Sequence, residues 1–445
     1  MHQAFNHHPS RVISRRRACA LFAKAGVASM LSTLPLRDLN QGSTPSITGE
    51  NVPALRDFDG LLMDYLKQNK SVPGASLAIA RDGRVIYARG FGYADVETSE
   101  AVHPDSLFRI ASVSKAFTSA AIMLLVQRGR LKLSDAAFPL LNIEVPSLKE
   151  SQVDARLKMI TIHQLLCHTG GWARGSAKNP FETWTGFDPM FFPVEIARSL
   201  GAPSPASPAD IVRFMTTRPL DFDPGTRYAY SNFGYCVLGR VIEKLSGVPY
   251  GDFVRNELFQ PLGIKDARLG KSLVSGRAPH EVHYYPSGDK RANSKNVFGG
   301  PDVQWCYGGF ELEAMDSHGG WIATPSDLVR FAASLEAPTR LAALNAESIQ
   351  RMFARPSETG YAVNGVELPG YYAYGWHVQS TVPEGMEEWH DGLFGGTSAL
   401  VMRRRDGVVW AATFNTENDD DKHVPSEVLA PRINHLADSI TKWPV

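Results

Sequence analysis

Three serine–lysine pairs in this chain have a spacing that suits acyl-transfer chemistry. A serine hydroxyl is a weak nucleophile until a neighbouring base removes its proton. A lysine in a desolvated site can lose its charge and become that base. Side chains three residues apart lie on the same face of a helix, so a serine and a lysine at this spacing can meet. The pairs are Ser112 with Lys115, Ser287 with Lys290, and Ser439 with Lys442.

Only the first pair stands before a long apolar helix. The run over 120–126 is rich in apolar helix formers, and no Gly or Pro follows before Gly129. Ser112 is therefore predicted at a helix N-terminus, where unpaired N–H groups and the helix dipole favour an oxyanion. Ser287 lies in a Pro- and Gly-containing loop, and Ser439 stands six residues from the end of the sequence.

A tyrosine and an asparagine further along the chain are the next candidates. Tyr230 and Asn232 form the only Tyr-x-Asn motif, at a predicted helix start. A phenol has a pKa of about 10, and nearby cations would lower that pKa and make Tyr230 a usable base or acid. Asn232 can donate to a substrate carbonyl while accepting from Lys115. The structural alternative is a helix-capping Asn beside a half-buried core Tyr.

His390, Asp391 and Gly392 complete the candidate site. They end a predicted strand, where a glycine lets a substrate lie against the strand edge. The backbone N–H of Leu393 could then join that of Ser112 as an oxyanion hole. The stretches 168–170 and 318–320 also read His-x-Gly, but only His390 combines a strand end with a following hairpin.

The elements that must bring these groups together are strands at both ends of the chain and helices between them. Asp82–Gly83 is a two-residue hairpin signal between two of the strands. The strands plausibly form one antiparallel sheet covered by helices from both termini, an α/β fold. Helices are expected over 54–69, after Ser112, over 162–168, from 208, over 232–245, from 325, over 346–354 and from about 426; strands are expected over 75–80, 84–88, 372–378, 387–390, 398–403 and 408–414. The irregular, aromatic-rich stretches 172–208 and 276–318 are candidate substrate-shaping loops.

The net charge limits the expected binding partners, and the N-terminal residues indicate where the protein is located. The 445 residues include 46 basic and 46 acidic side chains, so charge gives no reason to expect nucleic acid or an anionic membrane. Arginines 15–17 precede a mildly apolar run over 18–36, which resembles a twin-arginine export signal. This run is too short and interrupted for a stable membrane span. We expect an exported, periplasmic protein, or a cytoplasmic one if the leader is not functional.

The four cysteines lack zinc-ligand spacing, so buried free thiols are the default and we expect no metal or cofactor. The sequence carries no information on oligomeric state. The expected partner is a small-molecule or peptide substrate.

Taken together, the motifs resemble the serine β-lactamase-like hydrolases, which include class C β-lactamases, D-alanyl-D-alanine carboxypeptidases and related esterases. The likeness covers about residues 55–440, in the order of the family. The residues that carry it are 108–115, 165–172, 224–225 with 228–232, 319–320 with 324–327, and 390–392.

The resemblance implies a β-lactamase/transpeptidase-like fold, with an antiparallel sheet flanked by helices and an all-α subdomain. It divides the chain into an export signal and linker over 1–45 and a hydrolase domain over 46–445. The α/β part of that domain would be 46–107 and 365–445, and the helical part 108–364. Ser112 would become acylated, Lys115 and Tyr230 would share the work of the base, and Asn232 would position the substrate. His390 would take the place of Lys in a Lys-Thr-Gly motif.

Asp391 departs from the family pattern, which has Thr or Ser there to help bind a substrate carboxylate. A carboxylate at that place would repel such a substrate. We therefore expect neutral esters, amides or lactones to be preferred. Two alternatives stay open: a β-lactamase or D-Ala-D-Ala carboxypeptidase acting on β-lactams or peptidoglycan peptides, and a non-catalytic binding or sensor module of the same fold.

Overall fold

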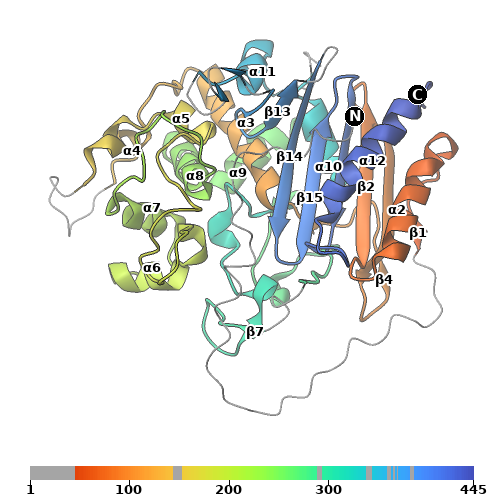
Figure 1. Cartoon of the computed structure of the whole chain (residues 1–445), viewed down its shortest axis with the longest axis horizontal. Coiled ribbons are helices and arrows are strands. Elements are labelled where there is room, and N and C mark those ends of the chain that lie inside the picture. The colour runs from red at the N-terminus through yellow and green to blue at the C-terminus, as the bar shows by residue number, and fades with distance from the viewer. Residues whose placement is uncertain are drawn as a thin grey trace.

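Nine strands of the described residues form one antiparallel sheet, which runs through the middle of the fold (Figure 1). The structure, a computed structural model, describes residues 46–143, 153–287, 293–336, 343–357, 362–363, 366–367, 369–380 and 385–444. In spatial order the strands are β1 (Ile47–Thr48), β3 (Arg84–Asp95), β2 (Gly74–Arg81), β16 (Val408–Phe414), β15 (Thr397–Arg403), β14 (Met386–Phe394), β13 (His377–Ser380) and β12 (Gly370–Tyr372), with β4 (Glu100–Ala101) paired to β3.

The two ends of the chain meet in the middle of this sheet. β2 and β16 pair antiparallel, in a register that runs from Ala75 opposite Phe414 to Arg81 opposite Val408. The hairpin between β2 and β3 turns at Asp82 and Gly83, whose φ angles of 51° and 74° suit a two-residue turn of this kind. The predicted joining of N- and C-terminal strands in one antiparallel sheet is confirmed.

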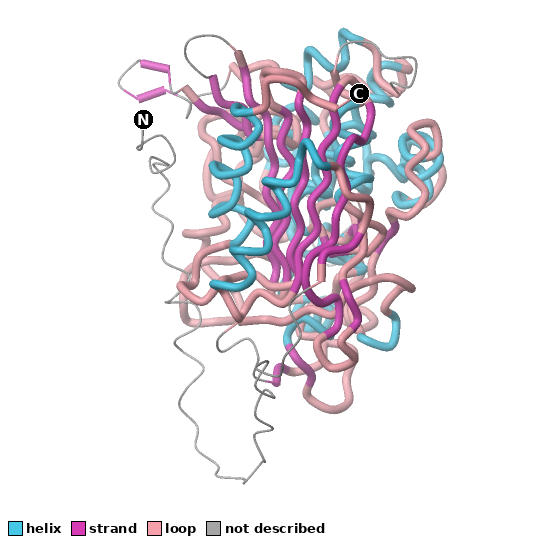
Figure 2. Tube along the Cα trace, turned by 90° about the vertical axis from the view of Figure 1, so that its right-hand side faces the viewer, coloured by secondary structure: helices cyan, strands magenta, loops and turns pink. Residues whose placement is uncertain are grey.

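Alternating side chains give the sheet two apolar faces. Leu77, Ile79 and Trp410 pack under α2 (Arg56–Gln68) and α12 (Pro425–Ser439), the helices nearest the two ends of the described chain. These two helices cover one face of the sheet (Figures 1 and 2). The residues between them in sequence, such as Ala78 and Ala411, face the larger core that contains the remaining helices. Their small side chains let that second layer approach the strands closely.

Most of the second layer comes from the middle of the chain. Thr161 caps α5 (Ile162–Leu166), Ser207 caps α7 (Pro208–Thr216) and Thr324 caps α10 (Pro325–Ala333), each in a capping box. α10 packs on β2, β15 and β16, although it comes from the stretch assigned to the helical part. The helices are α3 (Ser114–Gln127), α4 (Ala137–Leu141), α5 (Ile162–Leu166), α6 (Pro193–Leu200), α7 (Pro208–Thr216), α8 (Asn232–Ser246), α9 (Tyr250–Val254), α10 (Pro325–Ala333) and α11 (Ala346–Phe353).

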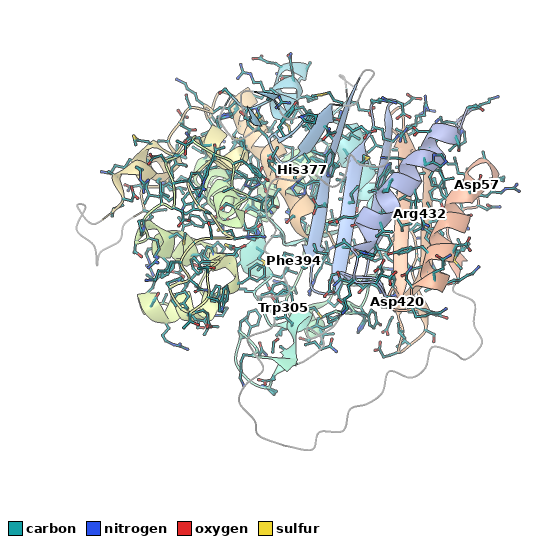
Figure 3. All side chains as sticks on the ribbon, in the orientation of Figure 1. Asp57, Trp305, His377, Phe394, Asp420 and Arg432 are labelled. Carbon is teal, nitrogen blue, oxygen red and sulfur yellow. The ribbon has the colours of Figure 1, made fainter. Side chains whose placement is uncertain are left out.

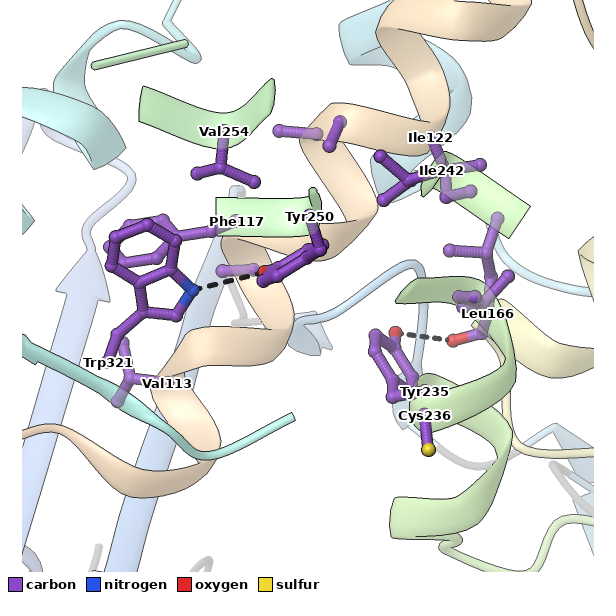
Figure 4. Packing of buried hydrophobic residues seen from close by; sticks show 14 of the residues in the cluster. Val113, Phe117, Ile122, Leu166, Tyr235, Cys236, Ile242, Tyr250, Val254 and Trp321 are labelled. Carbon is purple, nitrogen blue, oxygen red and sulfur yellow. Dashed lines mark hydrogen bonds between the residues drawn. The ribbon is translucent and has the colours of Figure 1, made fainter. Parts of the chain in front are cut away.

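α3 passes through the centre of the molecule. Its Phe117 ring lies edge-on to three aromatic rings, with centroid separations of 4.8 Å to Phe259, 5.9 Å to Trp321 and 4.7 Å to Phe331. Trp321 in turn donates its indole N–H to Tyr250 at 3.1 Å (Figure 4). The polar side chains in the first two turns of this helix, Ser114, Lys115, Thr118 and Ser119, are buried away from water.

Two of the predicted elements are wrong. The single strand expected over 372–378 is two strands, because the chain turns back at Gly375, with φ 78°, and the Ala373 N–H bonds the Trp376 carbonyl at 2.8 Å. The stretch 172–208, expected to be irregular, contains α6 and a 3₁₀ turn over Pro189–Phe191. α6 begins at Pro193. Because proline is also common in loops, it did not mark a helix start in this stretch of the sequence.

Several short pairings tie the long stretches together. β5 (Phe108–Arg109) and β6 (Arg268–Leu269) flank β9 (Trp321–Ala323), and β7 (Asn293–Ser294) pairs with β8 (Val303–Gln304). β10 (Ala362–Val363) pairs with β11 (Val366–Glu367).

Some expectations fall on residues outside the described chain. These are the leader over 1–45, including Cys19, and Lys290 of the second serine–lysine pair. Cys167, Cys236 and Cys306 are buried free thiols, as expected. Among the described residues, no helix has both the length and the apolar character needed to cross a membrane.

Candidate active site

Ser112 and Lys115 meet at the start of the central helix. Ser112 lies in a 3₁₀ turn over Ala111–Val113 that leads directly into α3. The Lys115 ammonium nitrogen lies 3.1 Å from Ser112 Oγ and donates to the backbone carbonyl of His318 at 2.9 Å. Lys115 is completely buried. The predicted pairing of a serine hydroxyl with a desolvated lysine is thus present in the structure.

The surroundings of Lys115 favour the neutral amine. Burial lowers the pKa of Lys115 well below its ordinary value, and the positive charge of Arg174 adds to this effect. Asp188 and Asp391 act in the opposite direction but do not outweigh the burial. A neutral Lys115 beside Ser112 Oγ has the free electron pair that a general base needs.

Tyr230 completes a three-membered group with Ser112 and Lys115. Its ring centroid lies 4.8 Å from Lys115 Nζ, and the Ser112 side chain is close enough to act on the pKa of the phenol. Burial raises the pKa of Tyr230 well above its ordinary value, and neither Ser112 nor Arg174 reverses that direction. The expectation that nearby cations would lower the Tyr230 pKa is wrong. Tyr230 is a phenol that can pass or donate a proton, while Lys115 is the better base.

Asn232 starts α8. The expected hydrogen bond from Lys115 to Asn232 is absent from the described contacts of the two residues. The Asn232 amide nitrogen donates to Asp188 at 2.7 Å, and this assignment is firm because a carboxylate only accepts. Asp188 also takes an ion pair of 3.4 Å from Arg174. Asp188 and Arg174, both from the stretch 172–208, therefore hold Asn232 beside Tyr230, whose ring lies 5.7 Å from the Arg174 guanidinium carbon. The sequence marked this stretch as a candidate loop but did not single out these two residues.

His390 lies on β14 with both ring nitrogens engaged. Nδ1 lies 2.6 Å from the carbonyl oxygen of Asp391, so it must carry the proton and donate. Nε2 lies 2.9 Å from the Tyr372 hydroxyl, from which it then accepts. Burial lowers the pKa of His390 far below its ordinary value. His390 is a neutral imidazole and supplies no positive charge to the site.

Gly392 brings β14 against the nucleophile. A Cβ atom on Gly392 would lie 2.0 Å from the carbonyl oxygen of Ile110 and 3.2 Å from the backbone nitrogen of Ser112. Only glycine permits this approach. Leu393 is the next residue of β14, so its backbone N–H remains the predicted partner of the Ser112 N–H in an oxyanion hole.

The two other His-x-Gly stretches contact residues of the site. The His318 carbonyl binds Lys115, and the His168 ring lies 4.3 Å from that of Tyr230 and accepts the Ser231 N–H at 3.2 Å. Burial lowers the pKa of both imidazoles, so neither is a charged competitor of Lys115. Their sequence signal was visible, but their roles were not.

One group of described side chains could hold a divalent cation. The ligand atoms of Asp95, Glu97 and His283 lie within 4.8 Å of one another. They stand on β3 and the segment packed against it, and the serine chemistry makes no use of them.

Comparisons with known proteins agree with the fold. A sequence model of the family described as Beta-lactamase matches residues 58–430. The chain is 27% identical over 365 residues to "Penicillin-binding protein 4*" of Bacillus subtilis, covering 81% of this chain and 72% of that one. It is 31% identical over 211 residues to "Esterase EstB" of Burkholderia gladioli, covering 46% of this chain and 49% of the esterase.

A solved structure has a similar fold. It is the octameric penicillin-binding protein homologue from Pyrococcus abyssi, with a TM-score of 0.63, 23% identity, and coverage of 86% of this chain and 77% of that one.

Proposed function

Because the chain belongs to the beta-lactamase family, we propose that it is a serine hydrolase that forms an acyl-enzyme on Ser112. The observation that carries this proposal is the completely buried Lys115, whose nitrogen lies 3.1 Å from Ser112 Oγ. Burying a lysine is costly, and a bare structural role would be served equally by an apolar side chain. The activities of the relatives, a penicillin-binding protein and an esterase, fit such a mechanism.

The proposed reaction has two stages. Neutral Lys115 takes the proton of Ser112 as its oxygen attacks the carbonyl carbon, and the oxyanion is stabilised by the N–H groups of Ser112 and Leu393. The Tyr230 phenol then gives its proton to the leaving alcohol or amine and takes up the proton held by Lys115, which leaves Lys115 neutral again. Water attacks the acyl-enzyme with the same base, which releases the acid and restores Ser112. Asn232 and Gly392 position the substrate along the β14 edge.

The proposed substrates are neutral esters and amides. His390 is neutral and Asp391 is an acid, so the third motif offers no positive charge to a substrate carboxylate. Action on β-lactams or on terminal D-alanine peptides is the second candidate, and the match to a penicillin-binding protein favours it. A non-catalytic module is the third, and the Ser112–Lys115 contact speaks against it.

A rate comparison tests the proposal. Hydrolysis of p-nitrophenyl butyrate and of benzylpenicillin is measured for the wild type and for Ser112→Ala. Ser439→Ala is the matched control, since Ser439 also precedes a lysine by three residues but lies at the end of α12. We expect ester turnover in the wild type and in Ser439→Ala and its loss in Ser112→Ala. Turnover that survives in Ser112→Ala would refute the proposal.

The same experiment separates the candidate substrates. Penicillin hydrolysis as fast as ester hydrolysis would favour the β-lactamase candidate, and turnover of neither substrate would favour the non-catalytic module.

Export is proposed separately. Arginines 15–17 and the apolar run over 18–36 support a twin-arginine-type leader. Fractionation of cells producing the full chain tests this, with replacement of the arginines by lysine as the variant expected to keep the protein in the cytoplasm.

A further inference from the structure

Asp391 stands beside the reacting groups on an accessible strand edge. Its neighbour Gly392 lies against the Ser112 backbone, and adjacent Cα atoms are about 3.8 Å apart. The last β14 residue paired with β13 is Trp389, which lies opposite His377, so from His390 onward no described strand covers that edge. The side chain of Asp391 is 39% exposed, whereas His390 is 1% exposed.

The carboxylate of Asp391 has no arginine or lysine partner among the described residues. Its recorded ion-pair contact is with His377 Nε2 at 3.8 Å, which is a long contact and charged only when the imidazole is protonated. The Arg174 guanidinium carbon lies 5.7 Å from the Tyr230 ring centroid, and that guanidinium is already paired with Asp188. The negative charge of Asp391 is therefore left largely uncompensated.

The neighbouring groups keep Asp391 ionised without neutralising it. Burial alone would raise the pKa of Asp391, but the His377 imidazole and the backbone N–H of Asp391 act in the opposite direction, and that pKa lies below its ordinary value. His390 is neutral, because its Nδ1–H donates to the Asp391 carbonyl and its Nε2 accepts from Tyr372. The third motif thus presents one negative charge and no fixed positive charge to a bound substrate.

From this charge arrangement we infer that Asp391 forms an ammonium subsite, so that the enzyme prefers esters or amides carrying a positively charged nitrogen near the scissile carbonyl. The inference rests on the proposed function and narrows its substrate class. A cation beside Asp391 replaces repulsion by attraction at a partly desolvated position, where charge complementarity has its largest effect on specificity. An anionic substrate is disfavoured for the same reason.

Matched ester pairs test the inference. Butyrylcholine and its uncharged isostere 3,3-dimethylbutyl butyrate place the charge on the leaving group. The p-nitrophenyl esters of 4-(trimethylammonio)butanoic acid and of 5,5-dimethylhexanoic acid place it on the acyl group. The quaternary nitrogen keeps its charge at every pH. The readout is the ratio of kcat/KM for the charged ester to that for its isostere, at low salt.

We expect this ratio to be at least about tenfold for one pair, and to approach one in Asp391→Asn. Asp57→Asn is the control, since Asp57 lies on α2, well apart from His377 across the molecule (Figure 3). Its ratio should equal that of the wild type. A wild-type ratio near one for both pairs, or a ratio that Asp391→Asn leaves unchanged, would overturn the inference.

The uncharged esters separate this failure from failure of the proposed function. If they are turned over in a Ser112-dependent way while the ratio stays near one, the hydrolase stands and the ammonium subsite falls. If Ser112→Ala turns over both members of each pair like the wild type, the hydrolase proposal falls and the subsite falls with it.

Discussion

At the scale of single residues, the proposed chemistry depends on Lys115, which the fold buries away from water. The spacing of Ser112 and Lys115 could be read from the sequence because three residues of helix bring them together. The protonation states of Lys115 and Tyr230 could not be read from the sequence. The pKa directions of Lys115 and Tyr230 depend on burial and on Arg174, which is distant in the sequence and comes close only in the folded chain.

The first prediction concerns the dependence of activity on pH. The lowered pKa of Lys115 means that kcat/KM should fall on the acid side, as Lys115 gains its proton. No fall caused by Tyr230 should occur below about pH 10, since its pKa is raised. Lys115→Arg keeps a charge that cannot be lost and should reduce kcat about 10²- to 10⁴-fold. The profile is measured with an uncharged ester; a Lys115→Arg variant as active as the wild type would contradict this role.

The second prediction concerns stability. Between the folded pKa of Lys115 and about 10.4, the unfolded chain binds a proton that the native chain does not, so stability rises with pH. The free energy of unfolding of the wild type, relative to Lys115→Met, should therefore increase by up to about 1.4 kcal/mol per pH unit. Urea unfolding of both proteins at pH 7, 8 and 9 measures the difference. A difference that is constant, or that falls with pH, would mean that Lys115 is charged in the native state.

At the scale of elements, β14 is the part that joins the sheet to the nucleophile. The sequence predicted a strand ending at His390, and the actual strand continues to Phe394 through Gly392. A glycine usually weakens a strand, so the pattern alone ended it early. The continuation is fixed by pairing with β15, in which Gly392 lies opposite Ala399. Such pairing depends on a distant segment and cannot be read from local pattern.

The third prediction tests this close approach. Gly392→Ala places a methyl group 2.0 Å from the Ile110 carbonyl oxygen, which is too close for two such atoms. β14 must therefore move away from Ser112. We expect kcat to fall at least about tenfold and the melting temperature to drop. Gly60→Ala is the matched control, because Gly60 is in α2 with nothing within 4 Å of an added Cβ. That variant should gain roughly 0.5–1 kcal/mol of stability and keep full activity. Equal behaviour of the two variants would count against the packing argument.

At the scale of the whole molecule, Arg109 ties the nucleophile to the long stretch 276–318. It stands three residues before Ser112 and is 1% exposed. Its guanidinium donates to the carbonyl oxygens of Lys271 at 2.8 Å and Cys306 at 2.5 Å, and it lies 3.9 Å from Glu281. The sequence could predict that strands from both ends share a sheet, because their patterns are regular. It could not predict this anchor, because the partners belong to segments without a repeating pattern.

The fourth prediction follows from that anchor. Arg109→Met leaves the buried Glu281 carboxylate without its counter-charge, which should cost about 3–5 kcal/mol of unfolding free energy. Adding Glu281→Gln removes the stranded charge and should restore part of the loss. Denaturant unfolding of the two single variants and the double variant measures the coupling. Strictly additive losses would show that the two side chains do not act as a pair.

The measurement that tests the central claim most directly is covalent labelling of the nucleophile. The purified protein is treated with a fluorophosphonate, which traps an activated serine, and its intact mass and labelled peptide are determined. We predict one label per wild-type chain, on Ser112, no label on Ser112→Ala, and a much slower reaction for Lys115→Met. A label on another serine, or equal labelling of Ser112→Ala, would contradict the account in which Lys115 activates Ser112 for acyl transfer.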